Sequence, residues 1–186
     1  MKKIFNIIIM LIYIHIISTS VYAQTYGPNL KGFQLGQTQE QVELNIKNMN
    51  LNMEKYDTEL IGGFTDSGMI QRKWVTAITA YSGYNIQNKT VLFTISIDCN
   101  TNKVINITIH NDGISNIWNS KGNRKGFIQA FINHYGIEKV EYNNDINGYI
   151  YEDNINGWKI GFLTSRNIEV TQIILLSIDK KQKFNF

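Results

Sequence analysis

The sequence predicts an α+β domain in which an antiparallel sheet of about six strands carries helices on one face. Two segments repeat apolar residues with the spacing of an amphipathic helix, and several others alternate apolar and polar residues as strands do. Two of the alternating stretches can also be aligned with each other without a gap. Together these observations predict two pseudo-repeated units, each a helix followed by strands.

The first 23 residues have the features of a secretory signal peptide. Lys2 and Lys3 precede a mostly apolar run, residues 4–17, and Val-Tyr-Ala at 21–23 fits the small-x-small rule for cleavage. The alternative is an uncleaved anchor, but the run is shorter than the roughly 20 residues that a spanning helix needs. We therefore expect cleavage after Ala23, export from a Gram-negative-type bacterial cytoplasm to the periplasm or the medium, and no membrane span in the mature chain.

Residues 24–186 are expected to form a single α+β domain, because the 163 residues that remain of 186 suffice for a hydrophobic core. Without Lys2 and Lys3 this part has 16 basic and 15 acidic residues, a net charge of +1. That balance gives no indication of nucleic acid or an anionic membrane as a partner. Cys99 is the one cysteine of the sequence, so no internal disulfide can form and packing has to provide the stability.

The first helix is predicted from its N-terminal signal and from one apolar stripe. Thr38 is a good N-cap residue, and Gln41 three positions later completes a capping box. Apolar residues follow at i, i+4, i+7 and i+11, which predicts about three helical turns. The stripe consists of Val42, Ile46, Met49 and Met53.

A second helix is predicted within residues 123–136. Gly136 supplies a left-handed C-terminal stop. The apolar face of this helix consists of Phe127, Ile128, Phe131 and Tyr135.

Residues 90–98 and 104–110 alternate apolar and polar residues, as two paired strands would. A four-residue loop would set Ile97 against Val104 but would leave the later isoleucines opposite polar residues. An odd loop, such as residues 99–103, gathers the apolar residues on one face, so we predict the odd loop. The pairs it predicts are Ile97 with Ile105, Ile95 with Ile107, and Phe93 with Ile109.

The same pattern recurs from Trp158 onward, where residues 158–175 can be laid on residues 93–110. In this alignment Ile174 corresponds to Ile109. Residues 74–81 and the segment "GYIYED" at 148–153 are predicted to add one strand to each unit. The final strand, Ile168 to Ile178, is apolar on both faces around "IILL", which predicts a central position covered on both sides.

The start of the first predicted helix resembles the entrance to small exported α/β modules. Such modules have a Gly-x-x-Leu-Gly-x-Thr/Ser run and then a helix with Glu or Gln and Val in its first turn. The segment is similar to β-lactamase-inhibitor-protein-like and outer-membrane-assembly lipoprotein (BamE-like) domains, although the inhibitor's paired cysteines and a lipobox are absent. The resemblance implies a fold and a protein-binding habit and carries over no binding residue. The matching residues are Gly32, Leu35, Gly36, Thr38, Gln41 and Val42.

The predicted elements bring together no set of residues suited to catalysis or to a metal. Cys99 and His110 fall at opposite ends of the predicted hairpin, roughly 20 Å apart at about 3.3 Å per residue. His134 is the other histidine after residue 23, and we expect it to pack beside Tyr135 at the edge of the second helix. No C-x-x-C, H-x-x-x-H, G-x-S-x-G or phosphate-binding loop occurs. We therefore expect no enzyme activity, no catalytic residue, no cofactor and no bound metal.

Aromatic residues in loop-like segments are the best candidates for a binding surface. Tyr81 and Tyr84 lie in "YSGYN", and Trp118 lies in "SNIWNSKGN". The alternative is that these rings fold back on the body of the domain. We expect a non-enzymatic protein-binding domain of the inhibitor or envelope accessory type, whose partner is another envelope or extracellular protein. The alternative function is a carrier that holds a small apolar or glycan ligand between sheet and helices.

Overall fold

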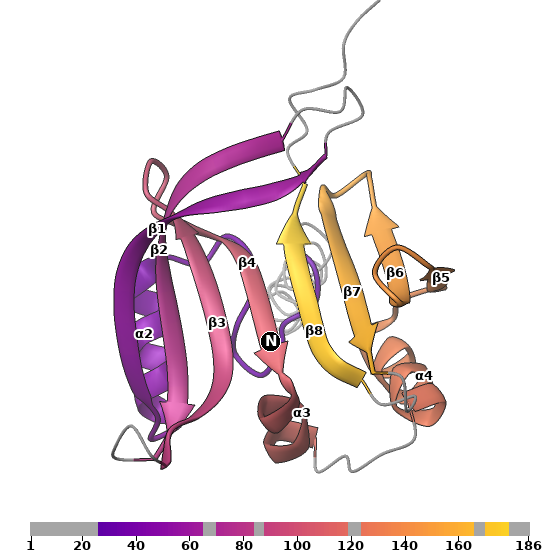
Figure 1. Cartoon of the computed structure of the whole chain (residues 1–186), viewed down its shortest axis with the longest axis horizontal. Helices are drawn as coiled ribbons and strands as arrows, with labels where there is room; N and C mark the ends of the chain where they lie inside the picture. Colours follow the sequence, from indigo (N-terminus) through magenta and orange to yellow (C-terminus); the bar gives the residue numbers. More distant parts are fainter. Residues whose placement is uncertain (1–25, 65–69, 84–87, 119–123, 166–169, 179–186) are drawn as a thin grey trace, which may run out of the picture.

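Figure 1 shows a computed structural model of the chain, which describes residues 26–64, 70–83, 88–118, 124–165 and 170–178. The helices in these ranges are α2 (Gln39–Asn48), α3 (Asn111–Trp118) and α4 (Arg124–Tyr135). The strands are β1 (Asn52–Phe64), β2 (Ile70–Ser82), β3 (Thr90–Asp98), β4 (Lys103–His110), β5 (Glu141–Asn143), β6 (Gly148–Asp153), β7 (Trp158–Thr164) and β8 (Val170–Ser177).

These strands form one antiparallel sheet with the order β1-β2-β3-β4-β8-β7-β6-β5. β1 to β4 make one meander and β5 to β8 make another. The two meanders meet where β4 pairs with β8, from Asn106 opposite Leu176 to His110 opposite Gln172. β8 is therefore central in the sheet, as its apolar sequence predicted (Figure 1).

The prediction of about six strands in two pseudo-repeated helix-plus-strands units was wrong, because the sheet has eight strands. β1 was missed because the side chains of residues 52–57 are all exposed, so Lys55 and Asp57 break any apolar alternation. The gapless alignment also failed. It equated Ile109 with Ile174, but Ile109 pairs with the equally buried Ile173, and Ile174 lies on the other face.

Helix α2 begins where the sequence predicted. The side chain of Thr38 accepts a hydrogen bond from the backbone N–H of Gln41, and the Gln41 side chain accepts one from the backbone N–H of Thr38. Val42 and Ile46 are fully buried. Met53 does not extend the helical stripe, because α2 ends at Asn48 and Met53 already belongs to β1.

Helix α4 was also predicted correctly. Ile128 and Phe131 are buried, and the ring of Phe131 lies edge-on to Phe162 of β7 with 5.1 Å between centroids. Gly136 has a φ of 66°, which confirms the left-handed stop. The ring of His134 packs against Tyr135 at 4.7 Å, as expected.

Helix α3 was not predicted, because the segment "SNIWNSKGN", with which it overlaps at residues 115–118, was interpreted as loop-like. Its Gly113 allows the helix to lie directly on the backbone of β3. A Cβ added at this position would lie closer to the backbone carbonyl oxygen of Leu92 than Cβ atoms lie to other atoms in real structures. It would also lie 2.9 Å from the Cγ2 of Ile109. The close approach lets Ile114 enter the core.

The odd loop predicted for the β3–β4 hairpin was wrong, although two of the three predicted pairs are present. The turn has four residues, 99–102, and sets Ile97 opposite Val104. A bulge at Ile105 then shifts the register by one residue, so that Ile95 pairs with Ile107 and Phe93 with Ile109. The bulge restores the apolar face that the odd loop was invoked to explain.

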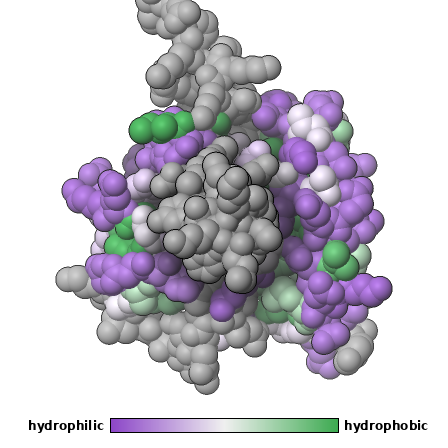
Figure 2. All heavy atoms as spheres, turned by 180° about the vertical axis from the view of Figure 1, so that it is seen from behind, coloured by the Kyte–Doolittle hydropathy of each residue, from purple (hydrophilic) through white to green (hydrophobic). Residues whose placement is uncertain are grey.

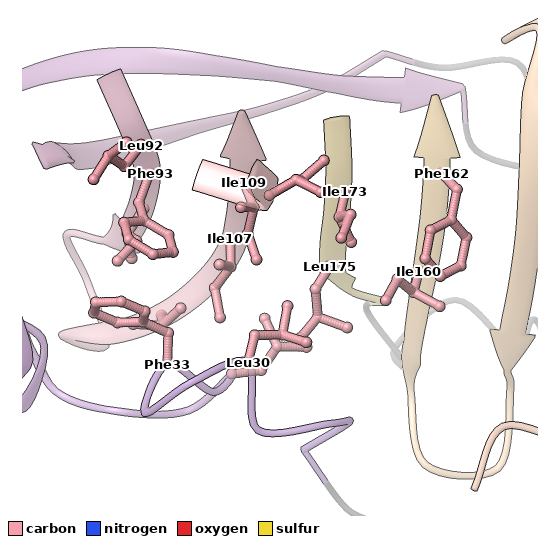
Figure 3. Packing of buried hydrophobic residues seen from close by; sticks show 14 of the residues in the cluster. Leu30, Phe33, Leu92, Phe93, Ile107, Ile109, Ile160, Phe162, Ile173 and Leu175 are labelled. Atoms are coloured by element: carbon pink, nitrogen blue, oxygen red, sulfur yellow. The ribbon is translucent and has the colours of Figure 1, made fainter. Parts of the chain in front are cut away.

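One hydrophobic core lies between the sheet and the helices (Figure 3). The segment before α2 contributes Leu30 and Phe33, which are fully buried, and the Phe33 ring lies 4.8 Å from that of Phe93. Side chains from α2, α3 and α4 reach the same core. Its largest fully buried members are Phe33, Phe93, Phe162, Leu30, Ile46, Ile78, Ile95, Ile97, Ile107, Ile109, Ile160 and Ile173.

The contact between α3 and β3 predicts that Gly113→Ala destabilises the protein. The new methyl group must displace either the helix or the strand, and such overpacking typically costs about 1–3 kcal/mol. Urea unfolding measures the change. Gly161→Ala is the matched control, because a Cβ there meets only the Cδ1 of Ile146, at 3.9 Å. Equal stability of the two variants would contradict the close approach.

Candidate functional site: the open face of the sheet

The two faces of the sheet have different surroundings. One face carries the core, to which α2, α3 and α4 all contribute buried side chains. We call the other the open face. It is turned towards the reader in Figure 1, where α2 lies behind the strands and none of the described helices covers it. Because neighbouring residues of a strand point to opposite faces, the register assigns the side chains of the open face directly.

The half of the open face formed by β6, β7 and β8 has an apolar centre, which Glu152, Lys159 and Gln172 border. Gly161 lies in the middle, with Ile150 of β6 on one side and Ile174 of β8 on the other. The Cδ1 of Ile146, from the β5–β6 turn, comes within 3.9 Å of the position that a Cβ on Gly161 would take. We call this surface the apolar half-face; its side chains, all partly exposed, are those of Ile146, Ile150, Leu163, Ile174 and Leu176.

The half formed by β2, β3 and β4 is more polar and less accessible. Val75, Ala77, Ser96 and Asp98 are all buried there. The distal half of the β1–β2 hairpin bends away from the other strands and leans over the ends of β4 and β8 (Figure 1). The apolar half-face is therefore the more accessible part of the open face.

Figure 2 shows the opposite side of the molecule, partly in colour. Where Figure 2 shows that side in colour, most residues are hydrophilic and hydrophobic residues are scattered. Leu44, which is 56% exposed on α2, is one exposed hydrophobic residue of that helix. Single exposed apolar residues of this kind are ordinary on protein surfaces.

His110 occupies the rim of the open face, where β4 passes into α3. Its Nε2 lies 2.9 Å from the hydroxyl of Thr94 on β3, and its Nδ1 lies 3.5 Å from the amide nitrogen of Gln172 on β8. Burial lowers the pKa of His110 below its ordinary value of 6.5, and the nearby Asp112 opposes this in part. The imidazole is therefore largely neutral at neutral pH and ties three central strands together.

A shallow hollow of about 370 Å³ lies beside this histidine. Its polar lining can form hydrogen bonds to a small ligand. On the two sides of the His110 ring stand the hydroxyl of Thr94 and the amide of Gln172. The lining residues are Lys89, Thr90, Val91, His110, Asn111, Asp112, Thr171 and Gln172.

The described residues contain no group of three or more His, Cys, Asp or Glu side chains that could hold a metal ion. Cys99 is exposed in the β3–β4 turn, 3.8 Å from the hydroxyl of Thr76, and His110 lies at the other end of the hairpin.

Of the three predicted binding aromatics, the structure describes the side chain of Tyr81. Tyr81 lies partly exposed near the end of β2, and the Lys89 ammonium sits 4.5 Å from the centre of its ring. Tyr84 lies outside the described residues. Trp118 ends α3, but its side chain is not among those described. A binding role for these three residues stays a prediction.

Sequence reasoning missed exposed aromatics, among them two on the β1–β2 hairpin, and misinterpreted one strand. Tyr56 and Trp74, 53% and 64% exposed, lie on the β1–β2 hairpin, whose first strand gave no pattern. The apolar character of β8 on both faces was visible, but we took it to mean that both faces are covered. Ile174 and Leu176 are in fact partly exposed.

No protein-family model, curated protein or solved structure matches this chain. The resemblance of the Gly32–Val42 segment to inhibitor-like and BamE-like modules therefore stays a prediction. Among the described residues, no helix has the length and apolar character needed to cross a membrane.

The lowered pKa of His110 predicts a pH dependence of stability. The unfolded chain takes up a proton near pH 6.5 and the folded protein only at lower pH, so stability falls as the pH drops below about 6.5. Stability stops falling once the pH is below the pKa of His110 in the folded protein. The measurement is the urea midpoint of unfolding at a series of pH values between 7.5 and 5. In His110→Gln the midpoint should fall less steeply with decreasing pH than in the wild-type protein.

His134→Gln removes an exposed imidazole from α4 and serves as the control for that measurement. An unchanged slope in His110→Gln, or an equal flattening in His134→Gln, would rule out His110 as the source.

Proposed function

We propose that this chain is an exported, non-enzymatic protein-binding domain of the inhibitor or envelope accessory type, which binds its partner through the apolar half-face. The support comes from one observation. Five aliphatic side chains gather around Gly161 on a sheet face that no described helix covers. Contiguous exposed apolar surface marks interaction sites when it is large.

The central place of β8 in the sheet strengthens the argument. Its Ile173 and Leu175 fill the core, while Ile174 and Leu176 point the other way. A solvated face of an antiparallel sheet normally carries polar side chains at such positions. A partner that covers Ile174 and Leu176 would complete the burial of this strand on both sides.

Export rests on the sequence of residues 1–23, with its two lysines, apolar run and Val-Tyr-Ala cleavage site. The non-enzymatic assignment rests on the chemistry of the described residues. The one hydrogen-bonded His–hydroxyl pair, between His110 and Thr94, has an amide rather than a carboxylate on the far nitrogen of the ring.

The hollow beside His110 favours a second candidate function, carriage of a small polar ligand such as a glycan. Its volume of about 370 Å³ lies within the range of small-ligand sites. An apolar ligand between sheet and helices has less support, because packed side chains such as Phe33 and Phe162 occupy that region (Figure 3). Glycan binding that is lost in His110→Ala and kept in Ile174→Glu would favour this candidate.

Ile174→Glu tests the protein-binding proposal. The full-length chain is expressed with a C-terminal tag, and the exported product is used for affinity capture from envelope and culture-supernatant extracts. A charge placed beside Gly161 should reduce recovery of the specific partner at least tenfold, because the carboxylate would be desolvated in the interface. Leu44→Glu, a matched change on the outer side of α2, should leave recovery unchanged.

Equal recovery by the wild-type protein and Ile174→Glu, with both folded by circular dichroism, would refute binding through the apolar half-face. Recovery of a small molecule and of no protein would refute the protein-binding function itself.

Export is tested separately by N-terminal sequencing and intact-mass measurement of the protein recovered outside the cytoplasm. We expect a chain that begins at Gln24, or its cyclised form, because Ala23 ends the predicted cleavage site. A mature protein that still begins at Met1 would contradict cleavage.

A further inference from the structure

The apolar half-face has an acidic rim. Glu141 of β5 pairs with Ile150, so it extends the row formed by Ile174, Gly161 and Ile150 towards the sheet edge. Two further acids border the same surface. Glu152 lies two residues beyond Ile150 on β6, and Asp145 directly precedes Ile146 in the β5–β6 turn.

The basic residues nearby neutralise this rim only in part. Lys139 contacts Glu141 at 3.3 Å with both side chains 78% exposed, and Lys159 contacts Glu152 at 4.0 Å. Such exposed pairs are weak and screened by salt, so a partner can compete for the carboxylates. Residues 138–159 contain five acidic and two basic residues, whereas residues 24–186 as a whole carry +1. Asp153 points to the core face of β6, so the acids that flank the apolar half-face are Glu141, Glu152 and, in the adjoining turn, Asp145.

The dimensions of the apolar half-face suit a helix. It spans three strands, about 10 Å at the usual spacing of 4.7–4.9 Å, which is close to the diameter of an α-helix. Gly161 leaves the centre low, with Ile150 and Ile174 on either side. Helices are the elements that most commonly cover the apolar face of a sheet.

We propose that the partner places an amphipathic helix on the apolar half-face, with its apolar stripe over Gly161 and lysines or arginines facing Glu141, Asp145 and Glu152. This inference rests on the proposed function and specifies the chemistry of the partner. A two-fold pair of identical chains fits less well, because the acidic rims would approach each other. Strand addition fits less well too, because the apolar side chains lie on the face and not along the β5 edge.

Two synthetic peptides test the inference with the exported full-length protein. Both are 14-residue helices with the same leucine stripe, one flanked by lysines and the other by glutamates. We expect the lysine peptide to bind at least tenfold more tightly at low salt, with hydrogen-exchange protection in β6, β7 and β8. The combined variant Glu141→Gln, Asp145→Asn, Glu152→Gln should remove most of this preference and keep its fold.

Ile174→Glu should weaken binding of both peptides, and Leu44→Glu should affect neither; if Ile174→Glu does not fold, Ile150→Glu takes its place. Equal affinity for the two peptides, protection limited to the β5 edge, or a dimer of the protein alone that Ile174→Glu dissociates would each overturn the inference. If charge preference is absent but capture of a natural partner still depends on Ile174, the partner chemistry is wrong and the proposed function stands. If capture does not depend on Ile174, the proposed function fails.

Discussion

The pairing of β4 with β8 is the constraint on which the rest of this structure depends. Only this ladder, from Asn106 opposite Leu176 to His110 opposite Gln172, joins the two four-stranded meanders into one sheet. It sets Ile107 beside Leu175 and Ile109 beside Ile173, all fully buried at the centre of the core. The same pairing brings Gln172 to His110, so the imidazole bridges both meanders at one end of the ladder.

Because side chains alternate along a strand, the register of β4 and β8 also determines which side chains lie on the open face. Once Ile173 and Leu175 are fixed in the core, Ile174 and Leu176 must point into the open face, because side chains alternate along a strand. β7 presents Gly161 next to Ile174, and β6 presents Ile150 beyond it. The apolar half-face therefore follows from the register of β8, and a shift of one residue would exchange it with the core.

The sequence predicted the elements whose signals are local. The capping box at Thr38, the stop at Gly136 and the alternation of residues 90–98 depend on nearby residues, and the structure has all three. The number of strands and the registers depend on distant contacts. In the β3–β4 hairpin, a bulge at Ile105 allows a turn that parity alone argued against.

The edge elements and the candidate site were harder to predict for related reasons. β1 has no apolar alternation over residues 52–57, because their side chains are all exposed at the edge of the sheet and do not need one. The apolar half-face was visible only as the unusual "IILL" of β8. A sequence that is apolar on both faces shows that both faces avoid water, but it does not show whether this chain or another one provides the cover.

The sequences of the two edge strands support the view that another chain covers the apolar half-face. β1 carries Glu54, Lys55, Asp57 and Glu59, and β5 has only three residues and begins with Glu141. Short strands and charged residues of this kind prevent uncontrolled pairing at sheet edges. On the open face of β6, β7 and β8 the charged residues are Lys159 and Glu152, which lie opposite each other with 4.0 Å between Nζ and Oε1. Charge thus protects the edges and is nearly absent from the centre of the apolar half-face, which is the distribution expected where association is specific to one face.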